Sequence, residues 1–457
     1  MQHSLSALAA AYDRSVPPSP GRPSFKLLMS KWLQRDRSGT NKLGEAVCRY
    51  AAYFSVLTQA CQLGDHGVLE EPQTDALYGL LASTFWHARA LDDAYWACLR
   101  KKDKWRSGAM PGRRYWLHQR KPEEAKSGFD FGIITSCDDD RVKDDDRVKD
   151  DDRVKVTLFQ AKRPAEAGRP LKLSLDHMVR QTNGISMHDF KERWGQLSAA
   201  AGKKIKQANM RGDVQRAGAL EAQRQNLERL YTQWETYALP QSKAISEIYK
   251  LLDKGKTAKE VLKAIKDDAQ IAAHITLTGR NSLFTRPYSY LQYDAFLVTA
   301  IRGWRIRNAV IPSNGWCHYA QWVNRSEGEP WSVPLEHAST LGDNEQDGGK
   351  RQRFAEVLGA SLSSEDQTVG LTINQSDLRD LAGAIMSNLP GLVWGAVADK
   401  PDTARKLLLQ CGVPEKEIVP HIGQAYPMPV TPVQQPDSEL GNGDAPRRSP
   451  RSPDVKF

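Results

Sequence analysis

The chain lacks long hydrophobic runs. None of its 457 residues falls in a stretch of about 18 consecutive apolar residues, so the sequence predicts no membrane-spanning helix and no membrane partner. The first residues, MQHSLSALAAAYDRSVPPSPGRP, have neither a basic start nor a long apolar core, which favours a frayed tail over a signal peptide. The composition, 40% hydrophobic and 26% charged, is typical of a globular protein with two or three domains.

Cysteine is scarce and dispersed. The six cysteines form no CxxC pair, which argues against a structural zinc site and against a disulfide framework, and a reducing cytoplasm is the expected location. The phosphate-binding motif GxxxxGK[ST] is also absent, so the chain is not expected to be a helicase or ATPase of that class. The net charge of +9 favours a polyanionic partner, although acidic residues are abundant too.

Hydrophobic periodicity divides the chain into segments with different expected secondary structure. Helical periods dominate the beginning and the middle of the chain, and short alternating segments interrupt them, so we expect an α+β (mixed α/β) fold with a large, mainly helical remainder. The expected divisions are a disordered tail at 1–24, a first domain at 25–185, a long helical region at 186–275, a mixed C-terminal domain at 276–425 and a disordered tail at 426–457.

Two β-branched segments flank a repeat. FGIITSC (131–137) and VKVTLFQAK (154–162) alternate as strands do, and between them DDDRVK occurs three times in a row over 138–155. Aspartate is unfavourable in strands, so we interpret the 18 repeat residues as a solvated loop that joins a hairpin spanning 130–163. If the hairpin is symmetrical about the centre of that loop, Asp130 lies opposite Lys162 or Arg163 at its open end.

Such a cluster has the parts for metal-assisted phosphodiester hydrolysis. Asp130 offers a hard oxygen ligand for Mg²⁺ or Mn²⁺, and the backbone carbonyl of Ala161 offers another. Lys162 could hold or deprotonate the attacking water or neutralise charge in the transition state. Gln160 shares a strand face with Lys162 and could ligate weakly or orient a water.

A second carboxylate is needed, and three glutamates are candidates. Glu124, or its neighbour Glu123, lies six or seven residues before Asp130 and is preferred because it stands just before the first strand. Glu45, in the amphipathic segment KLGEAVCRY, is the alternative.

The order of these residues resembles the PD-(D/E)xK nuclease superfamily. A glutamate, then Gly-Phe-Asp130-Phe-Gly-Ile, then a strand ending Leu-Phe-Gln-Ala-Lys-Arg is most similar to the branch with Gln-x-Lys, found in restriction endonucleases and anti-phage defence proteins. Phe129 stands where the usual proline precedes the aspartate. The resemblance implies a restriction-endonuclease-like core sheet flanked by helices, with Glu124, Asp130, Gln160 and Lys162 as the site.

The resemblance implies a cytoplasmic, metal-dependent DNA endonuclease in restriction or phage defence, working with other subunits of a defence system or as a homo-oligomer. Three alternatives remain open. The chain could be a non-catalytic DNA-binding or scaffold subunit with a vestigial nuclease fold, it could cleave RNA with the same cluster, or Asp130 and Lys162 could merely form an exposed salt bridge on a surface hairpin.

Several basic residues outside this cluster are candidate DNA contacts. Arg163, Lys203, Lys204, Lys206 and Arg286 lie in the strand end, the polar helical region and an aromatic-rich segment. The helical region is expected to be a hairpin of two long helices that turns near Gly212 and serves as a clamp on a duplex or as a dimer seam.

Adjacent Cys317 and His318 do not indicate a catalytic pair. In a strand they would face opposite sides, and NGWCHYAQW reads better as a buried element.

Overall fold

The structure is a computed structural model that describes eleven main segments of the chain. They are 42–63, 70–100, 114–120, 130–137, 152–162, 187–233, 254–267, 315–322, 330–335, 351–386 and 393–420, with a few single residues or pairs between them. The expected tails 1–24 and 426–457 fall outside these segments, apart from Arg14 and Ser24.

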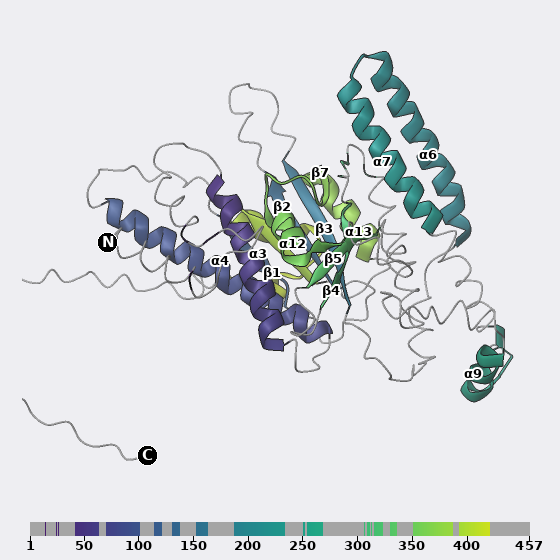
Figure 1. Ribbon diagram of the computed structural model, residues 1–457, viewed down its shortest axis with the longest axis horizontal. Helices are drawn as coiled ribbons and strands as arrows, with labels where there is room; N and C mark the ends of the chain where they lie inside the picture. The colour runs from purple at the N-terminus through teal and green to yellow at the C-terminus, as the bar shows by residue number, and fades with distance from the viewer. Residues whose placement is uncertain are drawn as a thin grey trace, which may run out of the picture. The chain divides into compact units, whose positions relative to one another are not determined.

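One mixed sheet is the centre of the described structure (Figure 1). Its strands are β1 (Tyr115–His118), β2 (Phe131–Cys137), β3 (Arg153–Lys162), β4 (Cys317–Gln321), β5 (Trp331–Pro334), β6 (Gln352–Arg353), β7 (Leu371–Asn374) and β8 (Val393–Ala398). They lie in the order β1-β8-β2-β3-β4-β5-β6, and β7 pairs with β3 beside β4. Together with the helices, this sheet confirms the α+β class.

Helices pack on both faces of the sheet. The described helices are α3 (Lys42–Leu63), α4 (Glu70–Arg100), α6 (Met187–Met210), α7 (Val214–Gln233), α9 (Ala258–Asp267), α12 (Phe354–Leu362), α13 (Leu378–Met386) and α14 (Pro401–Gln410), with 3-10 turns at Gln375–Asp377 and Glu415–Glu417. Among the described residues, no helix is long and apolar enough to cross a membrane.

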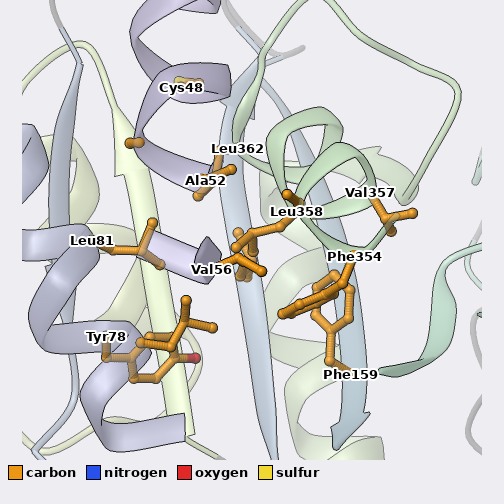
Figure 2. Packing of buried hydrophobic residues seen from close by; sticks show 14 of the residues in the cluster. Cys48, Ala52, Val56, Tyr78, Leu81, Phe159, Phe354, Val357, Leu358 and Leu362 are labelled. Carbon is orange, nitrogen blue, oxygen red and sulfur yellow. The ribbon is translucent and has the colours of Figure 1, made fainter. Parts of the chain in front are cut away.

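Two apolar clusters form the core, one on each face of the sheet. On one face Phe131 and Phe159 stack with ring centroids 4.8 Å apart, and α3, α4 and α12 cover them (Figure 2). On the other face Val156 and Leu158 pack with α13 and α14. Because both faces are covered, β2 and β3 are buried along almost their whole length.

The sheet draws strands from distant parts of the chain. β2 and β3 come from the range 25–185, whereas β4, β5, β7 and β8 come from 276–425, and β8 lies between β1 and β2. The two ranges expected as separate domains therefore build one sheet with shared cores, a pairing over long separations that local periodicity does not reveal.

The repeat loop is shorter than expected. β3 begins at Arg153, so the Arg-Val-Lys of the third DDDRVK copy belongs to the strand and the predicted loop boundary at residue 155 is wrong. The reason is that Val154 and Val156 continue the apolar alternation and pair with Ile373 and Leu371 of β7. The residues 138–151, including the first two copies, lie outside the described segments.

The helical hairpin has the predicted turn. α6 ends at Met210, α7 begins at Val214, and Gly212 between them has φ +70°, a left-handed conformation that glycine adopts without steric cost. A capping box precedes α9, where the Thr257 N–H donates to the Glu260 carboxylate at 2.8 Å.

Candidate functional site

Asp130 stands directly before β2, next to the end of β3. Its N–H donates to the Phe159 carbonyl at 3.2 Å, and its carboxylate accepts the Ala161 N–H at 2.5 Å. The carboxylate thus accepts a hydrogen bond that a backbone carbonyl would accept in a regular ladder. This happens at the residue before β2 begins, while β3 continues to Lys162. Asp130 is half-buried, which leaves part of the residue at the surface.

The register of the hairpin differs from the predicted one by two or three residues. Phe131 lies opposite Phe159, so Asp130 is level with Gln160 and not with Lys162 or Arg163. The prediction placed the turn at the centre of the 138–155 repeat, but the third copy contributes three residues to β3 and the connection is not symmetrical about that centre. Lys162 therefore lies two residues beyond the level of Asp130.

The backbone of Ala161 is directed towards Asp130. In a strand the N–H and C=O of one residue point to the same side, and alternate residues point to opposite neighbours. Phe159 and Ala161 both bond to Asp130 through their backbone, so the Ala161 carbonyl also faces the β2 side. This is the side on which the sequence predicts that carbonyl as a metal ligand.

Gln160 is a buried member of the site. It has 0% exposure, and it pairs across the parallel β3–β4 ladder with Tyr319, which is 1% exposed. Asp130, Gln160 and Tyr319 thus stand level on three neighbouring strands. Sequence reasoning missed Tyr319, because β4 is more than 150 residues away in the chain.

Lys162 is the last residue of β3 and lies opposite Gln321 of β4. Strand alternation places it on the same face as Gln160. Only its backbone is described, and the same holds for Glu45, which lies in α3. Four further predicted site residues, Glu123, Glu124, Arg163 and Arg286, lie outside the described segments.

The donors that are present are oxygens. Among the described residues no group of three or more His, Cys, Asp and Glu side chains could hold a metal ion. The carboxylate of Asp130 and the carbonyl of Ala161 form a small, hard donor set that fits Mg²⁺ or Mn²⁺ better than zinc, because Mg²⁺ keeps several waters and needs few protein ligands.

His318 and Cys317 do not form a catalytic pair. Cys317 packs in the core on the Val156 and Leu158 face, whereas the His318 ring lies on the opposite face, 5.7 Å from the Phe159 ring. Burial lowers the pKa of His318 to about 3, while the backbone of Gly315 raises it slightly, so the ring is neutral at pH 7. This agrees with the sequence-based expectation of a buried element.

A second lysine occupies the other end of β3. Lys155 is 0% exposed, and its ammonium donates to the carbonyls of Ala360 (2.5 Å), Ser363 (2.5 Å) and Asp366 (2.6 Å). Ala360 and Ser363 lie at the C-terminal end of α12, where carbonyls lack helical partners and a positive charge is favourable. Lys155 is a structural residue, and the charged repeat sequence around it concealed that role.

The predicted basic contacts of the helical region are exposed. Lys203, Lys204 and Lys206 all lie on α6 near the turn of the α6–α7 hairpin.

Compared with known proteins, the chain matches no family model, no curated protein and no solved structure.

Proposed function

We propose that the chain is a metal-dependent endonuclease that hydrolyses DNA phosphodiester bonds in restriction or anti-phage defence. One observation carries the proposal: the Asp130 carboxylate meets the backbone of Ala161, level with Gln160 and two residues from Lys162. Hydrolysis of this type needs two oxygen ligands for the metal ion and a positively charged side chain close to them.

Each residue has a defined role in the proposed reaction. Asp130 and the Ala161 carbonyl would hold a divalent ion, with Glu124 as the preferred further ligand and Glu45 as the alternative. A bound Mg²⁺ or Mn²⁺ supplies an activated water and neutralises charge on the phosphate. Lys162 would hold that water or take its proton, and the buried Gln160 would fix the end of β3.

The test is cleavage of plasmid DNA by the purified full-length protein with Mg²⁺ or Mn²⁺. Activity should vanish in EDTA and fall by about 10²–10³-fold in Lys162→Ala, the loss typical of removing one transition-state contact. Lys406→Ala is the matched control, because Lys406 is an exposed lysine on α14. Full cleavage by a folded Lys162→Ala protein would overturn the proposal, and cleavage of RNA alone would move the substrate class to RNA.

A non-catalytic DNA-binding or scaffold subunit is the second candidate. The complete burial of Gln160 favours it, because this side chain cannot reach a substrate from its present position. The two candidates differ in metal binding. An enzyme should show a Mn²⁺-dependent rise in melting temperature that Asp130→Asn removes, whereas a scaffold should show none.

A further inference from the structure

The α6–α7 hairpin pairs its two helices through a narrow seam. The seam residues are buried or half-buried and recur at three- and four-residue steps: Trp194, Ala201, Ile205 and Ala208 on α6, and Ala217, Leu220, Leu227 and Tyr231 on α7. The rings of Trp194 and Tyr231 stack 4.6 Å apart at the end away from the turn. Because these side chains pack on each other within the chain, the seam residues of α6 are not available as a dimer seam.

The opposite face of α6 is exposed and basic near the turn. Lys203, Lys206 and Met210 recur at steps of three and four residues and share one outward face, with Lys204 beside them. Met210 is 71% exposed, and Val214 across the turn is 79% exposed. The end of the hairpin therefore presents lysines and two apolar side chains to the solvent.

Positive charge is concentrated at this end. Residues 203–216 contain five basic residues and one acidic residue, a net charge of +4. The acidic residue, Asp213, caps α7 by accepting the Arg216 N–H at 3.1 Å. Within the described segments, the lysines at 203, 204 and 206 have no ion-pair partner.

Basic residues are balanced in two other described regions. Further along α7, Arg224 forms ion pairs with Glu221 and Glu228. The segment 399–417 around α14 has four basic and four acidic residues, a net charge of zero, and Arg405 pairs with Glu415. The excess at 203–216 thus differs from these two helix surfaces, and the segment 254–267 around α9 comes closest to it, with five basic and two acidic residues.

We infer that the end of the α6–α7 hairpin binds the phosphate backbone of duplex DNA, and the choice of DNA rests on the proposed function. Lysines on one helix face can neutralise several phosphates, a contact that does not depend on base sequence. The exposed face carries no aromatic ring for stacking on unpaired bases, which favours a duplex over a single strand. Two apolar side chains are too few for a helix that inserts into a lipid surface.

The test measures how tightly the full-length protein binds duplex DNA in EDTA. Binding is monitored by the fluorescence anisotropy of a labelled duplex over a range of salt concentrations. The triple variant K203Q/K204Q/K206Q should bind at least about 10-fold more weakly at low salt. The slope of log K against log salt should fall by about 2–3, as expected when three phosphate contacts are lost. The matched control, K400Q/K406Q/K416Q, removes the same charge from the exposed surface around α14 and should bind as the wild type does.

The outcomes separate this inference from the proposed function. Equal weakening by both triple variants, or no weakening by the first, would overturn the inference. So would a loss confined to duplex RNA or to anionic lipid vesicles, each measured with the same variants. Asp130→Asn should abolish cleavage and leave this binding unchanged. If no variant or metal gives cleavage while the hairpin lysines still control binding, the nuclease proposal fails and the inference stands.

Discussion

The two ends of β3 use similar residues for different purposes. At the beginning of the strand, Lys155 is fully buried and donates to three backbone carbonyls around the end of α12. At its end, Lys162 lies two residues beyond the level of the half-buried Asp130, which directly precedes β2. One end is held through a fully buried lysine, whereas the other carries the contact between the Asp130 carboxylate and the backbone of Ala161.

Under the proposed function, this difference would separate stability from chemistry along one strand. A buried ammonium with three acceptors stabilises a single arrangement of β3 and α12, since losing it leaves those carbonyls without partners. Lys162, at the other end of the strand, is the lysine to which the proposed function gives a role in the reaction. The following variants test this division through the free energy of unfolding, measured by denaturant titration.

The largest effect is expected at Lys155. Lys155→Met keeps much of the volume but removes all three hydrogen bonds, so the free energy of unfolding should fall by about 3–5 kcal/mol. Lys406→Met, at an exposed position, should change it by less than about 0.5 kcal/mol. Equal stabilities for the two variants would mean that Lys155 does not hold α12.

Gly370 should give the next largest effect. It has φ +97°, and an added Cβ would lie 2.6 Å from Lys155 Cγ and 2.7 Å from Thr157 Oγ1. Gly370→Ala should therefore lower the free energy of unfolding by about 2–3 kcal/mol through strain and crowding. Gly383→Ala is the matched control: it is exposed in α13 with nothing within 4 Å, and it should stabilise the protein by about 0.5–1 kcal/mol. If Gly370→Ala left the free energy of unfolding unchanged, the packing around Lys155 would have room for the added methyl group.

The third effect is a pH dependence. Burial lowers the pKa of Lys155 from 10.5 to about 8. Between these values the unfolded chain binds a proton that the folded chain has lost, so this residue makes stability rise with pH, by at most about 1.4 kcal/mol per pH unit. The wild type should thus gain stability relative to Lys155→Met from pH 8 to pH 9.5. Taking the difference between the two proteins cancels other titrating groups, and parallel curves would contradict the prediction.

Asp130 should have the smallest effect on stability. An asparagine can still accept the Ala161 N–H, so Asp130→Asn should lower the free energy of unfolding by about 1 kcal/mol or less. In a plasmid assay the same variant should lose cleavage, because the amide replaces a charged metal ligand. A loss of stability in Asp130→Asn as large as that in Lys155→Met would mean that both ends of β3 contribute equally to stability, which would contradict the proposed difference.

Local patterns predicted the elements near the site. The alternation in FGIITSC and VKVTLFQAK places β2 and β3 to within one residue, and the glycine at 212 marks the turn of the helical hairpin. Both depend on side chains within a few residues of each other. The same reasoning brought Asp130 next to the end of β3, but with a register error of two or three residues.

Long-range contacts were beyond the reach of these patterns. The partners of Lys155 lie more than 200 residues away, so a lysine within DDDRVK gives no local sign of burial. Gln160 pairs with Tyr319 of β4, and Phe131 pairs with Val393 of β8; both partners lie more than 150 residues further along the chain. The register error arose from assuming a symmetrical loop, when β7 pairing extends β3 into the third repeat.

The merging of the last repeat copy with β3 affects how this gene can change. Slippage during DNA replication would add or remove DDDRVK in units of six residues between the paired ends Cys137 and Arg153. Whichever copy comes last would still precede VTLFQAK and supply the buried lysine. Even one copy would leave three aspartates to close the hairpin, a common loop length. The locus can therefore vary in length without disturbing the core.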